Sequence, residues 1–163
     1  MYIAVTGHRP DKIGGHYFLS TQRRWIRHQL RDKLIENQPT ACISGMALGT
    51  DQDFAWTAMF LGIPVLAAIP FVGQEARWNA SAQAFYRSLL ERCYYIQVVC
   101  PGEYAAWKMQ KRNEWMVDHC ELLLAVWDGS SGGTENCLEY AHKIGRRVLR
   151  INPNDFFEVP HDS

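Results

Sequence analysis

Short apolar runs alternate with longer amphipathic segments along this chain. The apolar runs cover residues 2–6, 40–44, 64–69, 95–99, 122–126 and 147–151. Short runs rich in apolar residues predict β-strands, and the first of them, residues 2–6, predicts a buried strand. The segments between them carry apolar side chains at helical spacing and predict helices at residues 20–37, 50–61, 81–92, 105–119 and 135–144. This alternation predicts a three-layer α/β fold, in which helices cover both faces of a mostly parallel sheet of about six strands.

Residues that start or stop helices set the expected boundaries. Ser20 is a suitable N-cap, and Gly62 and Gly145 each follow the end of a predicted helix. The segment 7–19 and the loop 71–79 have no regular pattern, and segment 7–19 is long enough to be functional. We expect one domain over residues 1–153 and a polar tail over residues 154–163.

Composition narrows the classes of protein to consider. The chain has 163 residues, of which 47% are hydrophobic, as is usual for one soluble domain. Its 17 Lys and Arg residues balance its 17 Asp and Glu residues, and this neutrality does not favour nucleic acid as a partner. The N-terminus has no signal-peptide pattern, and no apolar run approaches the length of a membrane span. We therefore expect a cytoplasmic protein with no membrane partner.

The cysteines and histidines have no metal-binding pattern. The five cysteines include no C-x-x-C pair, and the six histidines include no H-x-x-x-H pair. Several cysteines lie in apolar segments, which predicts buried, reduced thiols. The sequence predicts no metal site and no cofactor.

Glycines, hydroxyls and charged side chains follow three of the predicted strands. These segments are Gly7-His8-Arg9, residues 44–51 (SGMALGTD) and residues 128–134 (DGSSGGT). Glycines let an anion approach the backbone, and the helix that follows adds free N–H groups and a positive dipole end. The alternative is a set of capped turns without a ligand. Two such loops at one edge of the sheet favour anion binding, although neither loop has the spacing of a Walker loop or a dinucleotide-binding turn.

Two further positions are candidates for ligand contact. In the helix 105–119, Arg112 and Asn113 share a face with Met109 and Met116. A buried arginine needs a partner such as a ligand phosphate, or else it lies at the edge of the face and reaches solvent. After the third strand, Gln74 and Trp78 are spaced one helical turn apart and could hold a nucleobase, although a core tryptophan is an equal alternative.

Five stretches of the sequence together resemble the SLOG superfamily, and within it the YpsA-like branch. They are VTGHRP, SGMALGTD, IPFVGQEARW, KRNEWMVD and AVWDGSSGGT, in this order over residues 5–134. The superfamily also contains the Lonely Guy phosphoribohydrolases and the Smf/DprA proteins. The resemblance implies a Rossmann-like fold with a nucleotide-derived ligand at the glycine-rich loops. It also implies that Arg112 and the Gly133-Thr134 loop correspond to functional positions of the Lonely Guy enzymes. The glutamate of those enzymes falls on Cys137 here, with Glu135 and Glu139 nearby but out of register.

Three hypotheses follow about function. The first is a module that senses or sequesters a phosphate-bearing nucleotide or nucleotide derivative. The second is an N-glycosidic hydrolase acting on a nucleoside 5′-monophosphate, with Arg112 and Glu135 as catalytic residues and Asp51 or Asp128 as alternative carboxylates. The third, binding of single-stranded nucleic acid, fits the neutral charge least. Family members often associate, so we also expect a homo-oligomer. The residues expected to contact the ligand are Gly7, His8, Arg9, Ser44, Gly45, Gly49, Thr50, Asp51, Gln74, Trp78, Asn113, Asp128, Gly129, Ser131, Gly132, Gly133 and Thr134.

Overall fold

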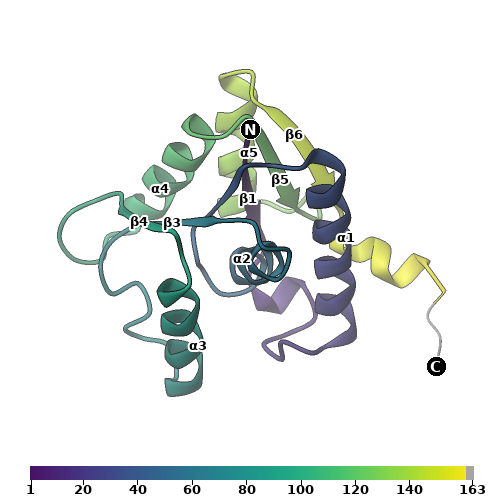
Figure 1. The fold of residues 1–163 in the computed structure, drawn as a ribbon, viewed down its shortest axis with the longest axis horizontal. Helices are drawn as coiled ribbons and strands as arrows, with labels where there is room; N and C mark the ends of the chain where they lie inside the picture. Colours follow the sequence, from purple (N-terminus) through teal and green to yellow (C-terminus); the bar gives the residue numbers. More distant parts are fainter. Residues whose placement is uncertain (161–163) are drawn as a thin grey trace.

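Six strands form a single parallel sheet in the computed structural model, which describes residues 1–160 (Figure 1). The strands are β1 (Tyr2–Gly7), β2 (Ala41–Ser44), β3 (Val65–Ile69), β4 (Tyr95–Val98), β5 (Leu122–Val126) and β6 (Arg147–Ile151). Their order across the sheet is β4-β3-β2-β1-β5-β6, and every neighbouring pair is parallel. The Rossmann-like α/β fold predicted from the sequence is confirmed.

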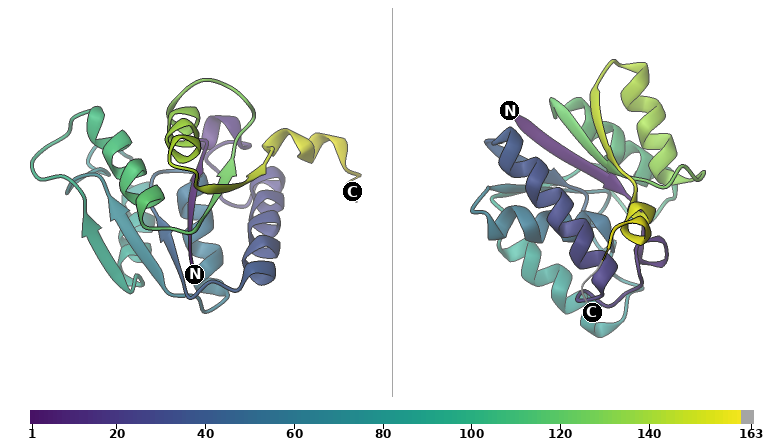
Figure 2. Two further views of the ribbon diagram at one scale, coloured as in Figure 1. Left: turned by 90° about the horizontal axis from the view of Figure 1, so that it is seen from above. Right: turned by 90° about the vertical axis from the view of Figure 1, so that its right-hand side faces the viewer.

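Helices cover both faces of this sheet (Figure 2). They are α1 (Thr21–Asn37), α2 (Thr50–Phe60), α3 (Ala80–Glu91), α4 (Trp107–Asp118) and α5 (Gly133–Lys143). Successive side chains of a strand point to opposite faces. Ile3 and Val5 of β1 therefore pack in the core with α1, α2 and α3, whereas Ala4 packs in a second core with α4 and α5.

Helix starts agree with the sequence pattern to within two residues, and the two largest differences are at α4 and at α5, which begins at Gly133 rather than at the predicted Glu135. Ser20 caps α1 as predicted, because its hydroxyl accepts a hydrogen bond from the Arg23 N–H at 3.4 Å. Helix α4 begins at Trp107 rather than at the predicted Ala105. The Lys108 N–H donates to the Ala105 carbonyl, three residues back, at 3.0 Å, so the turn before α4 has 3₁₀ rather than α geometry.

Part of the expected polar tail packs against the domain. Residues Pro153–Glu158 form a short 3₁₀ helix, η2. The Gln22 side chain donates to the Pro153 carbonyl at 2.9 Å, and the Trp25 and Phe156 ring centroids are 6.1 Å apart. The last residues of that predicted tail, 161–163, lie outside the described part of the chain.

The cysteines are free thiols, as the sequence predicted. Cys42, Cys100, Cys120 and Cys137 are buried, and Cys93 is half-buried. Burial raises the pKa of Cys42 and Cys137 to about 12, so both stay protonated at neutral pH. Across residues 1–160, no helix combines the length and apolar character that crossing a membrane requires.

The chain changes direction across the sheet next to β1. From β1 the strands proceed through β2 and β3 to β4, and β5 then returns to the other side of β1. Loops that follow β1 and β5 therefore diverge above the carboxyl ends of the strands, which is where open α/β sheets bind ligands.

Candidate functional site

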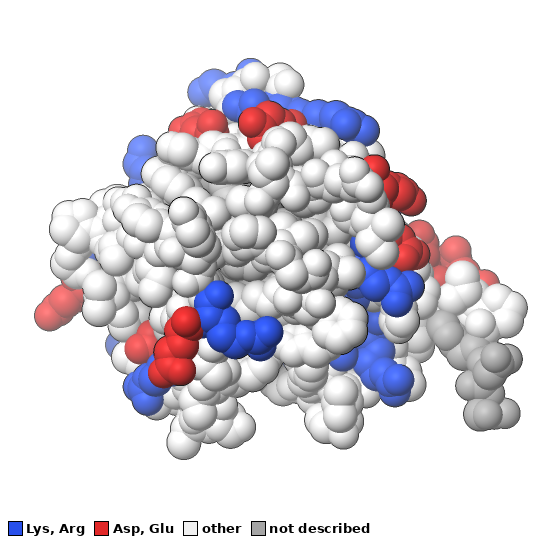
Figure 3. Space-filling model, viewed as in Figure 1, with Lys and Arg blue, Asp and Glu red and all other residues white. Residues whose placement is uncertain are grey.

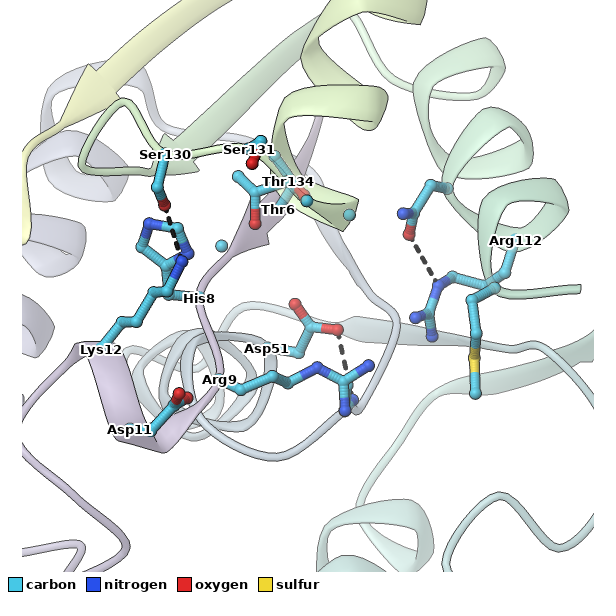
Figure 4. A pocket seen from close by; sticks show the side chains of 16 residues that line it. Thr6, His8, Arg9, Asp11, Lys12, Asp51, Arg112, Ser130, Ser131 and Thr134 are labelled. Carbon is cyan, nitrogen blue, oxygen red and sulfur yellow. Dashed lines mark hydrogen bonds between the residues drawn. The ribbon is translucent and has the colours of Figure 1, made fainter. Parts of the chain in front are cut away.

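A cavity of about 390 Å³ lies at this point, between the loops that follow β1 and β5 (Figure 4). Helix α4 forms its far wall, and the start of α2 lies at its base. The cavity is lined by Thr6, Gly7, His8, Arg9, Asp11, Lys12, Ala47, Asp51, Met109, Arg112, Asn113, Ser130, Ser131, Gly132, Gly133 and Thr134.

Close contact between the loop after β1 and helix α2 fixes one wall. The Thr50 hydroxyl donates to the His8 carbonyl at 2.9 Å. A Cβ added to Gly7 would lie 2.7 Å from the Thr50 Cβ, which is closer than atoms can pack. Glycine is therefore needed at position 7 for β1 to approach α2, and this contact holds His8 and Arg9 at the rim of the cavity.

The amino-terminal end of α5 faces the cavity without a side-chain cap. Its N-cap is Gly132, whose φ of 142° lies in a region that suits glycine. Gly133 and Thr134 follow as the first helical residues, and a Cβ built on Gly133 would meet no atom within 4 Å. The first N–H groups of a helix have no partner inside it, and they carry the positive end of the helix dipole. This end of α5 therefore presents an anion-binding surface to the cavity.

A hydrogen-bond network holds the loop before α5. The Ser130 hydroxyl donates to Asp128 Oδ1 at 2.5 Å and accepts from Lys12 Nζ at 2.7 Å. His8 Nε2 lies 2.8 Å from the same Asp128 oxygen, so both loops that flank the cavity meet at this carboxylate. Hydrogen bonds from Ser130, and then from His8, hold the pKa of Asp128 well below its usual value. Asp128 thus serves as an ionised anchor for the two loops.

Arg112 reaches the cavity from α4 and is 3% exposed. Its Nη1 donates to the Gly45 carbonyl at 2.6 Å, and its Nε donates to Asn113 Oδ1 at 2.9 Å. A Cβ on Gly45 would lie 2.6 Å from the Arg112 Cζ, so only glycine leaves room for the guanidinium. Nη2 makes no hydrogen bond within the described residues and remains available to a ligand.

Asp51, the second residue of α2, is the buried carboxylate of the cavity. Its Oδ2 accepts from the Ala47 N–H at 3.2 Å, and 6% of the residue is exposed. Burial raises the pKa of Asp51, against the opposing influence of Arg112 and Arg9. Burial likewise lowers the pKa of Arg112, which Asp51 opposes. Each of the two groups therefore favours the charged form of the other.

Positive charge predominates in the lining. Arg9, Lys12 and Arg112 contribute cations, whereas Asp11 and Asp51 contribute carboxylates. The dipole end of α5 adds further positive potential. Among the described residues there is no group of three or more side chains arranged to hold a metal ion. The arrangement suits a small anion or an anionic group of a larger ligand.

Several of the expected ligand contacts do lie on the cavity wall. They are Gly7, His8, Arg9, Asp51, Arg112, Asn113, Ser131, Gly132, Gly133 and Thr134. Gly45 lies directly beneath Arg112, and Thr50 and Asp128 hold the loops as described above. Gly129 stands between Asp128 and Ser130 outside the lining.

Other expected contacts lie elsewhere. The Gln74 amide donates to the Gly45 carbonyl and to the Tyr86 hydroxyl, both at 3.1 Å, and Trp78 packs edge-on against Tyr86. Ser44 is fully buried and bonded to the Asp51 carbonyl, and Gly49 lines a neighbouring hollow. Glu135 is half-buried and outside the cavity lining.

Six residues of the lining were not among the expected ligand contacts. They are Thr6, Asp11, Lys12, Ala47, Met109 and Ser130. Lys12 lies three residues after Arg9, in the 3₁₀ turn Pro10–Lys12. The signal that could have identified it was a second cation close to Arg9 in a long loop without a regular pattern. Ser130 lies inside the glycine-rich segment itself, where a second hydroxyl beside Ser131 pointed to it.

Comparison with known proteins gives a family and several relatives. The model of the YspA SLOG family (YpsA) matches residues 3–149. The SPbeta prophage-derived protein YoqJ of Bacillus subtilis is 38% identical over 157 aligned residues, which cover 80% of this chain and 92% of YoqJ.

Solved structures with this fold include two DNA processing proteins A (DprA). The DprA of Streptococcus pneumoniae superposes with a TM-score of 0.64 at 20% identity. The match covers 92% of this chain, which spans 50% of the length of that chain. That of Helicobacter pylori, described for its single-stranded DNA binding mode, has a TM-score of 0.66 at 13% identity, with 92% of this chain and 64% of that chain covered. At these identities the likeness is one of fold.

Proposed function

Because this chain belongs to the YspA SLOG family, we propose that it binds the phosphate group of a nucleotide or nucleotide derivative in the cavity between β1 and β5. The observation that carries this proposal is the uncapped start of α5, which faces a cavity that also contains Arg9, Lys12 and Arg112. A phosphate at Gly132–Thr134 would accept hydrogen bonds from free backbone N–H groups.

The size and side chains of the cavity suit a mononucleotide. Its volume of about 390 Å³ is within the usual range of small-ligand pockets. Arg112 Nη2 is free to donate to a phosphate oxygen, and Lys12 already donates to Ser130 beside the loop. The Met109 side chain and the aliphatic part of Arg9 provide apolar surface for the remainder of the ligand.

Native mass spectrometry of the purified chain tests the proposal directly. We expect a co-purified mass of nucleotide size, or tighter binding of AMP, GMP, CMP, UMP or IMP than of the matching nucleoside. Equal affinity for a nucleoside and its monophosphate, with no co-purified nucleotide, would contradict a phosphate site. Tighter binding of a short single-stranded oligonucleotide than of every monophosphate would instead support a DNA-binding role.

Gly133→Val is expected to weaken monophosphate binding at least about tenfold. A Cβ at this position meets no heavy atom within 4 Å, so the fold should persist, yet the side chain would stand where a phosphate must approach the backbone. Asn136→Val in the same helix is the matched control, because Asn136 is exposed and outside the cavity lining. Calorimetric titration measures both affinities, and equal affinity in the two variants would contradict the phosphate position.

Hydrolysis of a nucleoside monophosphate is a second candidate, and the carboxylate of Asp51 within the cavity favours it. Cleavage of an N-glycosidic bond needs a carboxylate near the anomeric carbon, where positive charge develops. Asp51 is the buried carboxylate of the cavity lining, whereas Glu135 is half-buried outside the lining.

Chromatography of the five monophosphates after incubation with the protein decides between binding and hydrolysis. If the chain is a hydrolase, wild type releases free base, and Asp51→Asn abolishes release while it retains or strengthens binding, because a negative charge is removed from the cavity that the anionic ligand enters. Abolition by Glu135→Gln instead would assign the role to Glu135. Binding without release of base from any monophosphate would leave the chain a binding module for these compounds.

A further inference from the structure

The two edges of the sheet differ in how they are protected. An edge strand presents unpaired backbone groups, and natural proteins guard such edges with charges, prolines or bulges. Strand β6 carries Arg147 and Arg150, both exposed. The Arg150 Nε donates to the Trp127 carbonyl at 2.9 Å, and its guanidinium lies 4.9 Å from the Trp127 ring centroid. The β6 edge is therefore guarded by two cations.

Strand β4, at the opposite edge, has no such protection. Residues 93–100 read CYYIQVVC, with no charged residue and no proline. The pairing with β3 runs without interruption from Leu66–Tyr95 to Ile69–Val98, so the described strand has no bulge. Figure 3 shows that the surface over β4 and the loop after it is largely uncharged, whereas charged side chains gather near the turn from α5 to β6.

Apolar side chains of this strand are exposed on both faces of the sheet. Tyr95 is 52% exposed, and its neighbour Ile96, which points to the opposite face, is 42% exposed. Tyr94, just before the strand, is 79% exposed, and Val98 is 38% exposed. An uncharged, apolar segment with high β-propensity at a free edge is an aggregation hazard unless another strand covers it.

We propose that β4 pairs antiparallel with β4 of a second copy of this chain, which joins two six-stranded sheets into one. The apolar edge of β4 is exposed as soon as the chain folds, and a second copy of the chain is always present to cover it. Antiparallel pairing of a strand with itself is a twofold arrangement, which closes at a dimer. Each side chain then meets the same segment of the other copy. Such pairing brings no like charges together at β4, whereas at β6 it would bring arginines together.

Sedimentation velocity over a range of concentrations tests this proposal. We expect wild type to be a dimer, and we expect Ile96→Lys to raise the dissociation constant at least about tenfold, because each copy would then place a lysine in an otherwise uncharged, apolar strand pair. Ile35→Lys is the matched control, since Ile35 on α1 is 54% exposed and distant in sequence from β4. Its dissociation constant should equal that of wild type.

Hydrogen exchange of wild type locates the interface without any substitution. Backbone amides in residues 94–99 should become more protected as the concentration rises through the dissociation constant. A monomer at every concentration, a dimer that Ile96→Lys leaves intact, or exchange in 94–99 that does not depend on concentration would each overturn the proposal. If Ile96→Lys fails to fold, the exchange measurement on wild type decides the matter.

Discussion

Asp53→Ala is expected to lower the free energy of unfolding by about 3–5 kcal/mol, the usual cost of breaking a buried ion pair from one side. Asp53 is fully buried in α2. Its two oxygens accept from Arg23 Nη2 at 2.9 Å and Nε at 3.0 Å, and Oδ1 also accepts from Arg27 Nη1 at 3.2 Å. Removal of the carboxylate leaves two guanidinium groups buried without a counter-charge. Arg23 also donates to the His16 carbonyl at 3.1 Å, so the long loop before α1 should loosen as well.

Asp32→Ala is the matched control for this prediction. Asp32 pairs with Arg31 at 3.2 Å on the surface of α1, and its side chain is 52% exposed. Exposed pairs of this kind contribute at most about 1 kcal/mol. Urea denaturation measures the free energy of unfolding of both variants, with Asp53→Asn as a milder change if the alanine variant does not fold. Equal losses in Asp53→Ala and Asp32→Ala would show that the buried cluster does not stabilise the fold.

Arg112→Ala is expected to weaken binding of a nucleoside monophosphate by about 1.5–3 kcal/mol, or roughly ten- to 150-fold. A charge-assisted hydrogen bond from Nη2 to a phosphate oxygen would be lost. Removal of Arg112 would also raise the pKa of Asp51 further, because the guanidinium opposes the effect of burial on that carboxyl. Arg112→Lys should restore only part of the affinity, because a lysine ammonium cannot reproduce the planar fork of the guanidinium.

Calorimetry on these variants, with Arg87→Ala on the exposed surface of α3 as control, measures the effect. Thermal unfolding without ligand shows whether the lost bond to the Gly45 carbonyl has disturbed the fold. Affinities of Arg112→Ala and Arg87→Ala that match wild type would confine Arg112 to a structural role between α4 and the loop after β2.

The hydrophobic pattern alone determined the elements, their order and the layers of this protein. Runs such as residues 122–126, apolar throughout and buried at every position, are typical of a strand covered on both faces. Ser20 as N-cap of α1 was likewise readable, because capping depends on neighbours only three residues away. The face of α4 that carries Arg112 and Met116 followed from helical spacing, and the structure places Arg112 in the cavity and Met116 in the core.

Only the tertiary structure decided which side chains meet. Lys12 and Ser130 are 118 positions apart, and Arg112 and the carbonyl of Gly45 are 67 positions apart. No local pattern predicts such contacts, because they depend on how the strands are ordered around β1. Gln74 was expected to contact the ligand for the same local reasons, but its amide donates to the Gly45 carbonyl and the Tyr86 hydroxyl instead of facing the cavity. Periodicity fixes which face of an element is buried, but the direction of a loop side chain is set by the packing of distant elements.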